Sequence, residues 1–287
     1  MDKYNEIFTA SKVEVDDAAI KLATEKLVAD NIDKYRTKEV YKQIYNCIDL
    51  TTLATTDSHR SVTEFVDGVN AFEEEHPELG NVAAICVYPN FAATVTSALE
   101  VSGVGVAAVA AAFPSAQTFA EIKTTEIALA VLDGATEIDV VMNLGYLLEG
   151  NYEELADELA ELKMAAKDAT LKVIIETGAL KTAENIKRAA LMAIYSGADF
   201  VKTSTGKVYD GANIEAVYTI CQIIKEYHAK FGTKIGVKVS GGVVTTEDAL
   251  QYYTVASEIL GEEWMNNQYF RIGASRLATY ILEDIFN

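Results

Sequence analysis

The chain has 287 residues, half of them hydrophobic, and carries 43 acidic side chains against 24 lysines and arginines. A net charge of −19 argues against nucleic-acid and anionic membrane partners, which require a basic face. No apolar run reaches the roughly 18 residues that span a bilayer, and the start lacks the basic and apolar regions of a secretory signal. We therefore expect a cytoplasmic protein that contacts no membrane.

The cysteine pattern excludes two kinds of stabilising site. Cys47, Cys86 and Cys221 form an odd set without a CxxC pair, which argues against a disulfide framework and against a thiolate zinc site. We expect three reduced thiols.

From residue 44 onward, short β-branched runs alternate with longer amphipathic ones, a pattern typical of βα units around a parallel sheet. The helical segments are marked by apolar stripes such as Val62, Phe65, Val66 and Val69. Eight units favour a closed (β/α)8 barrel over an open doubly wound sheet. The eight predicted strands are Ile44–Asp49, Val82–Tyr88, Val104–Ala110, Glu137–Met142, Leu171–Glu176, Asp199–Thr203, Ile235–Val239 and Tyr269–Ile272.

A segment of about 40 residues precedes this repetition. Asp16 and Asp17 stand before a helical stripe of Ile20, Ala23 and Leu27. We divide the chain into an N-terminal helical extension, residues 1–40, and a barrel domain, residues 41–287. The extension is expected to cap the bottom of the barrel or to serve an interface, and a homo-oligomer such as a dimer is possible.

Charged residues stand inside four of the predicted apolar strands. Lys202 follows Phe200 and Val201, Lys238 occupies the equivalent place on the next strand, and Asp139 and Asp49 lie on strands four and one. Buried charged residues are either functional or members of satisfied ion pairs. Two lysines on adjacent strands favour function, since desolvation and a neighbouring cation both lower an amine pKa and leave it nucleophilic. A nucleophilic amine attacks a carbonyl group.

Three loop or helix-start segments at the ends of strands six, seven and eight could bind a phosphate. Their glycines let backbone N–H groups approach an anion, and a helix N-terminus at Ser275 would add its dipole. Barrels commonly hold phosphate after strands seven and eight. Each glycine could equally serve a tight turn. The glycines in question are Gly206, Gly241, Gly242 and Gly273.

Other chemistries find little support in the sequence. His59, His76 and His228 are the chain's histidines, and we expect surface positions for them, so a metal site of histidine and carboxylate ligands is disfavoured. The sequence contains no GxGxxG, GxxxxGK[ST] or GxSxG motif. We therefore expect neither a metal nor another cofactor.

The segments IDLTTL, AAICVYP, EIDVV, LKVIIETG, FVKTSTGK and GVKVSGG occur together between Ile48 and Leu277. With these motifs the chain resembles the deoxyribose-phosphate aldolase family. The resemblance implies a Schiff base on Lys202, a pKa-perturbing role for Lys238 and proton transfer by Asp139. It also implies support from Asp49 and a sugar-hydroxyl contact from Thr205.

The resemblance further assigns phosphate contacts to Gly206, Lys207, Gly241, Gly242, Gly273 and Ser275. Arg276 stands where the family commonly has serine. We expect its guanidinium to contact the phosphate, and the alternative is a pair with a surface acid. The implied reaction is reversible cleavage of 2-deoxy-D-ribose 5-phosphate to acetaldehyde and D-glyceraldehyde 3-phosphate, in deoxyribonucleotide catabolism.

Two rival functions stay open at this point. Another lysine-dependent sugar-phosphate aldolase, or a transaldolase, would keep Lys202 but act on a different carbon skeleton. A non-catalytic sugar-phosphate-binding barrel is disfavoured because an idle pair of strand lysines would only cost desolvation energy.

Overall fold

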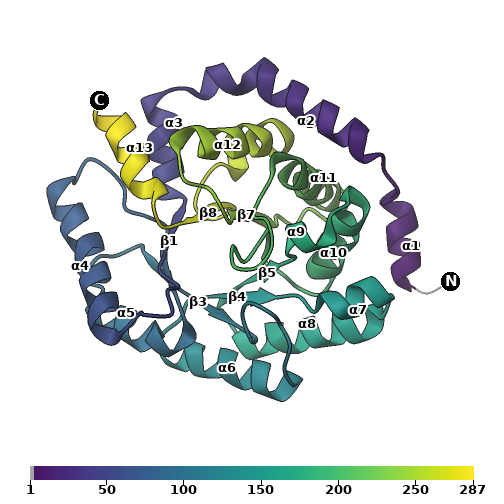
Figure 1. Cartoon of the computed structure of the whole chain (residues 1–287), viewed down its shortest axis with the longest axis horizontal. Coiled ribbons are helices and arrows are strands. Elements are labelled where there is room, and N and C mark those ends of the chain that lie inside the picture. The colour runs from purple at the N-terminus through teal and green to yellow at the C-terminus, as the bar shows by residue number, and fades with distance from the viewer. Residues whose placement is uncertain (1–2) are drawn as a thin grey trace.

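The computed structural model describes residues 3–287, and its centre is a closed barrel of eight parallel strands in the order of the chain (Figure 1). The predicted (β/α)8 fold is confirmed. The strands are β1 Ile48–Thr51, β2 Ala84–Val87, β3 Gly105–Ala110, β4 Glu137–Val141, β5 Thr170–Ile174, β6 Phe200–Lys202, β7 Gly236–Ser240 and β8 Phe270–Ala274.

A ring of helices covers the outside of the barrel (Figure 1). Short 3-10 turns lie at Ile32–Tyr35 (η1), Pro89–Phe91 (η2) and Glu262–Trp264 (η3). The helices after the strands are α4 His59–Glu75, α5 Ala92–Ala98, α6 Ala120–Leu132, α7 Leu144–Glu149, α8 Tyr152–Ala166, α9 Thr177–Leu180, α10 Ala183–Tyr195, α11 Ile214–Phe231, α12 Thr246–Leu260 and α13 Leu277–Phe286.

The first strand was placed too early. Residues 44–46 belong to helix α3 (Lys38–Asn46), and β1 starts at Ile48. Thr37 caps this helix by accepting a hydrogen bond from the backbone N–H of Val40. Val40, Tyr41, Ile44 and Tyr45 then recur at helical spacing, and this stripe extends the helix through the apolar run that we took for a strand. The other seven predictions fall within two residues of the observed strand ends.

The N-terminal segment packs against the outer helices. Helix α1 (Lys3–Ala10) lies beside α10, and α2 (Asp17–Asn31) lies along α11 and α12 (Figure 1). Asp17 accepts a hydrogen bond of 2.7 Å from the backbone N–H of Ala183 at the start of α10, and Arg36 pairs with Glu247 of α12. The expectation that the segment caps the barrel bottom is therefore wrong. Its role at an interface and the boundary at residue 40 stay predictions.

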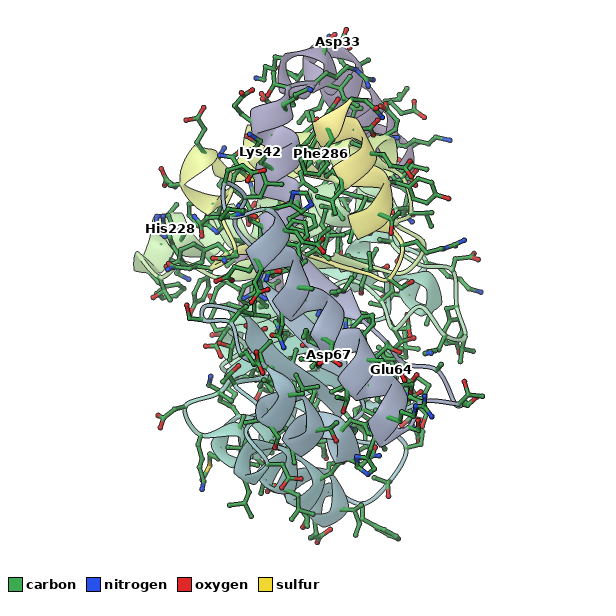
Figure 2. The ribbon with its side chains drawn as sticks, turned by 90° about the vertical axis from the view of Figure 1, so that its left-hand side faces the viewer. Asp33, Lys42, Glu64, Asp67, His228 and Phe286 are labelled. Carbon is green, nitrogen blue, oxygen red and sulfur yellow. The ribbon has the colours of Figure 1, made fainter. Side chains whose placement is uncertain are left out.

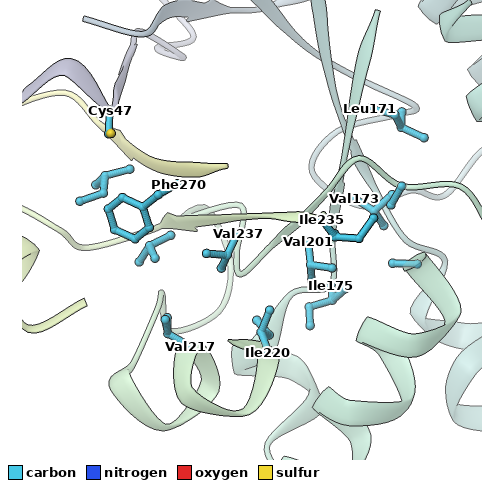
Figure 3. Close-up of a cluster of buried hydrophobic side chains, with 14 of the residues drawn as sticks. Cys47, Leu171, Val173, Ile175, Val201, Val217, Ile220, Ile235, Val237 and Phe270 are labelled. Carbon is cyan, nitrogen blue, oxygen red and sulfur yellow. The ribbon is translucent and has the colours of Figure 1, made fainter. Parts of the chain in front are cut away.

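The main hydrophobic core lies between the strands and the helices. Figure 3 shows Val201 and Val237 pointing toward Val217 and Ile220 of α11, and all four are fully buried. Because successive side chains of a strand point to opposite faces, the neighbours of these valines point into the barrel. Those neighbours include Lys202 and Lys238.

Candidate active site

Two lysines enter the barrel from adjacent strands. Lys202 on β6 and Lys238 on β7 are direct partners in the register of the sheet. Lys202 is 4% exposed and Lys238 is fully buried. The outward valines that precede them pack on α11, and this packing fixes the two side chains in the interior. The structure thus brings together the two lysines that the sequence singled out.

Asp139 of β4 is the common partner of the lysines. Its Oδ2 atom accepts a hydrogen bond of 2.7 Å from Lys202 and another of 2.7 Å from Lys238. Its Oδ1 atom accepts a bond of 2.9 Å from Lys172 of β5. The carboxylate is completely buried, and such a group is stabilised only by paired charges.

A second set of charged side chains lies next to Asp139 inside the barrel. Lys238 also bonds to Asp49 of β1, and Arg271 of β8 donates to Asp49 Oδ1 at 2.5 Å. The guanidinium reaches Glu137 of β4 at 2.8 and 3.1 Å. Glu137 in turn accepts from Lys172. Four cationic side chains and three carboxylates therefore form one network inside the barrel.

The network gives the lysines different protonation tendencies. Burial lowers the pKa of Lys202 below its ordinary value, and Lys238 adds to this effect while Asp139 opposes it. Burial acts in the same direction on Lys238, but Asp139 and Asp49 outweigh it and raise the pKa of Lys238. Burial also disfavours the charge of Asp139, yet the surrounding lysines hold the pKa of Asp139 well below its usual range. Lys202 is thus the amine best suited to act as a neutral nucleophile.

Four charged residues near the predicted site were missed at the level of the sequence. Lys172 lies between Leu171 and Val173, and Arg271 lies between Phe270 and Ile272. A charged residue inside an apolar strand was the signal that found Lys202, so the same signal was available for both. Glu137 stands at the start of a strand, and Glu176 stands after one, and neither position gave a comparable signal.

The loops after β6 and β7 meet through glycines at the mouth of the barrel. A Cβ atom on Gly206 would lie 3.2 Å from the Cα of Gly241. A Cβ atom on Gly211 would lie 2.1 Å from the carbonyl oxygen of Gly241. Gly206 and Gly241 also have φ angles of +69° and +90°. Here the glycines serve close backbone contact as well as the turn.

Thr205 is fixed in this loop by a buried carboxylate. Glu176, which follows β5, accepts hydrogen bonds from the backbone N–H of Thr205 at 3.2 Å and from its hydroxyl at 2.5 Å. The next cation, Lys207, is exposed and donates to the carbonyl oxygen of Leu53 at 2.5 Å. This bond joins the loop after β6 to the loop after β1.

The remaining predicted phosphate residues lie at the ends of β7 and β8. Gly242 and Ser275 are exposed, and Gly273 leaves room for the Lys238 side chain, whose Cε atom would lie 3.1 Å from an added Cβ. Helix α13 begins at Leu277 with Arg276 as its N-cap, so the predicted helix start at Ser275 was two residues early. Arg276 is exposed and pairs with no carboxylate within residues 3–287.

The histidines occupy separate parts of the molecule. His59 is exposed at the start of α4, and His76 caps the end of that helix. His228 lies near the end of α11, edge-on to Trp264 at 4.9 Å. Figure 2 shows His228 at one margin of the molecule, well apart from Glu64 near the start of α4. Within residues 3–287, no group of three or more His, Cys, Asp or Glu side chains is arranged to hold a metal ion.

The fold and the buried lysines are those of an enzyme of the (β/α)8-barrel class, and Lys202 stands at the C-terminal end of β6, the end of the strands where such barrels carry their chemistry. The comparison with protein families is more specific. Residues 45–275 match the DeoC/LacD family aldolase model, and the chain belongs to this family.

Two relatives match this chain over most of its length. The chain is 38% identical to a putative deoxyribose-phosphate aldolase of Caenorhabditis elegans, over 87% of this chain and 85% of that protein. It is 36% identical to the deoxyribose-phosphate aldolase of Homo sapiens, over 96% and 91% of the two chains.

A solved structure has the same fold. The crystal structure of a putative deoxyribose-phosphate aldolase from Coccidioides immitis superposes with a TM-score of 0.71 at 27% identity, over 94% of this chain and 98% of that one. Within residues 3–287, no helix is both long enough and apolar enough to cross a bilayer.

Proposed function

We propose that this family member is a class I deoxyribose-phosphate aldolase in which Lys202 forms the Schiff base. The observation that supports this most directly is the buried Lys202 amine, 2.7 Å from Asp139 and next to Lys238. The substrate class follows from the relatives, which are named deoxyribose-phosphate aldolases at 35–38% identity.

The first step is attack of neutral Lys202 on C1 of the open-chain sugar aldehyde. A carbinolamine forms, and loss of water gives an iminium ion. This cation withdraws electrons from the C2–C3 bond. Lys238 keeps its proton, and its charge favours the neutral form of Lys202 at the start of the cycle.

In the second step the C2–C3 bond breaks. The C3 hydroxyl loses its proton, glyceraldehyde 3-phosphate leaves, and the electron pair remains on C2 as an enamine. Asp139, acting through water, accepts the hydroxyl proton and returns one to C2. Hydrolysis of the new iminium then releases acetaldehyde and restores Lys202. Protein groups supply every proton transfer, so we propose a reaction that requires neither metal nor cofactor.

Phosphate binding is assigned to the mouth of the barrel. Gly206, Gly241, Gly242 and Ser275 offer backbone donors, and Lys207 and Arg276 offer exposed cations; Thr205 is assigned to the sugar hydroxyls. The net charge of −19 repels an anionic substrate at long range. Local cations at the mouth are therefore needed to hold a dianion. We place the reaction in the cytoplasmic catabolism of deoxyribonucleotides.

Borohydride trapping tests the proposal. Incubation with deoxyribose 5-phosphate and borohydride should reduce an imine on Lys202, and peptide mapping by mass spectrometry should locate the adduct there. Lys202→Leu should abolish both trapping and turnover. An adduct mapped to another residue would overturn the assignment.

A cleavage assay, combined with the trapping, separates the two rival functions. A sugar-phosphate aldolase with a longer donor would cleave fructose phosphates faster than deoxyribose 5-phosphate. A non-catalytic binding barrel would bind the sugar phosphate but give no adduct and no aldehyde product.

We also propose that the chain forms a dimer through the outer face of α6. Four large apolar side chains are more than half exposed on this helix and at its N-cap: Phe119, Ile122, Leu129 and Leu132. They stand at positions i, i+3, i+10 and i+13, which places them on one side of the helix, and exposed apolar surface of this kind marks interaction sites. Sedimentation analysis should find a dimer for the wild type and a monomer for Leu129→Lys/Leu132→Lys, and a wild-type monomer at micromolar concentration would refute the proposal.

A further inference from the structure

The charged network of the barrel reaches from the lysines at the mouth side to the opposite, N-terminal end of the strands. Arg271 is the second residue of β8, and its side chain also bonds to the carbonyl of Asn267, just before the strand. Arg271 and Glu137 line a cavity of about 360 Å³ together with residues at the starts of β3 and β6. The pair therefore forms the floor of the network, away from the substrate mouth.

The network carries one positive charge in excess when every member is ionised. Its cations are Lys172, Lys202, Lys238 and Arg271, and its carboxylates are Asp49, Glu137 and Asp139. An uncompensated charge in a buried site is costly, and loss of one proton from one lysine removes it. Because all seven side chains are buried, an excess charge costs more free energy here than it would in water.

Lys202 is the lysine best placed to lose that proton. Among residues 3–287 it pairs with a single carboxylate, that of Asp139, whereas Lys238 pairs with two and Lys172 with three. The least compensated cation is the first to deprotonate. The direction of its pKa shift agrees with this geometric ranking.

We propose that Arg271 and Glu137 are positioning residues that set the charge state of the Schiff-base lysine from the far end of the barrel. Arg271 contributes the cation that gives the network its excess positive charge, and the carboxylate of Glu137 limits this excess to one charge. This inference rests on the proposed function of Lys202. Seven of the eight strands, or the loops after them, bring titratable or charged groups to the interior around Lys202, and β3 brings the uncharged Ala107 and Val109. Besides Lys202 itself, these groups are Asp49 on β1, Cys86 on β2, Glu137 and Asp139 on β4, Lys172 on β5, Glu176 after β5, Lys238 on β7 and Arg271 on β8.

The size of the effect follows from the register of the sheet. Lys202 pairs with Lys238, and Lys238 pairs with Arg271, so the backbones of Lys202 and Arg271 are two strand spacings apart. Two strand spacings amount to about 10 Å. A unit charge at about that distance in a partly shielded interior changes a pKa by about one unit.

The experiment measures kcat/KM for deoxyribose 5-phosphate against pH in four variants. Arg271→Met removes one cation, so Lys202 should keep its proton up to a higher pH. The acid limb of the pH profile, where activity falls as Lys202 becomes protonated, should therefore move up by about one pH unit. Glu137→Gln removes one carboxylate and should move the limb down. The double variant restores the excess of one charge and should return the limb close to the wild-type position. Arg271→Lys should leave it unchanged.

The controls separate charge from structure. Lys123 and Glu158 form another buried ion pair, 2.8 Å long, between α6 and α8 outside the barrel interior. Lys123→Met/Glu158→Gln should lower the melting temperature without moving the acid limb. If Arg271→Met does not fold, the opposite shift in Glu137→Gln and the restored limb in the double variant decide the question.

Each result has a distinct meaning. The role of the pair would be overturned if the acid limbs of all folded variants coincide. It would also be overturned if the acid limb of the double variant is shifted as far as that of either single variant. A wild-type enzyme that yields no borohydride adduct on Lys202 would instead overturn the proposed function, and this is measured independently of the pH profiles.

Discussion

Replacing Lys238 with leucine should raise the pH that the enzyme needs for activity. The ammonium groups of Lys202 and Lys238 each lie 2.7 Å from the same Asp139 oxygen, so their nitrogens are at most twice that distance, 5.4 Å, apart. At an effective dielectric constant of about 20, two unit charges at this separation repel by about 3 kcal/mol. Since one pKa unit corresponds to about 1.4 kcal/mol, the missing charge should raise the pKa of Lys202 by about two units.

The sign of the pH effect follows from the nucleophile. Neutral Lys202 is the reactive form, so activity is present above its pKa in the free enzyme and lost as the pH falls below it. In Lys238→Leu the acid limb of kcat/KM should move up by about two pH units, with lower activity at neutral pH. Lys238→Arg keeps the charge and serves as the control. An active Lys238→Leu enzyme with the wild-type acid limb would refute the electrostatic role of this lysine.

Two further predictions concern the phosphate and the metal. Arg276→Ser should raise KM for deoxyribose 5-phosphate about 10-fold, because a charge-assisted hydrogen bond contributes about 1.5–3 kcal/mol, and it should leave unphosphorylated deoxyribose nearly unaffected. Equal changes for both sugars would assign Arg276 to the surface. Activity should also survive prolonged treatment with EDTA, and a loss that a divalent ion reverses would contradict a metal-free reaction.

The barrel was predictable because its signals are local and repeated. Each βα unit shows a short β-branched run followed by an amphipathic stripe, and a parallel sheet connects such units in chain order. The first strand failed because Ile44 and Tyr45 fit a helix as well as a strand, and only the stripe from Val40 onward distinguishes the two. The placement of α2 depends on contacts with α11 and α12, which lie far away in the sequence.

The site was predictable to the extent that its members interrupt apolar strands. Lys202, Lys238 and Asp139 do so, and the structure joins them at 2.7 Å. Which carboxylate pairs with which lysine depends on the register and the inward direction of each side chain, and neither is visible in one sequence. Glu176 illustrates the limit, because its link to Thr205 joins two loops 29 residues apart.

Charged side chains line one part of the barrel interior, and small uncharged side chains line the rest. On β1 and β4–β8 it is filled by the paired charges, whereas β2 and β3 contribute the small side chains Ala84, Cys86, Ala107 and Val109. Cys86 lies close enough to Lys202 and Lys238 for their charges to lower the pKa of its thiol, although burial, the larger effect, raises it. Because these uncharged side chains offer no ion pair, Lys202 is compensated by Asp139 alone within residues 3–287, and burial can lower the pKa of its amine.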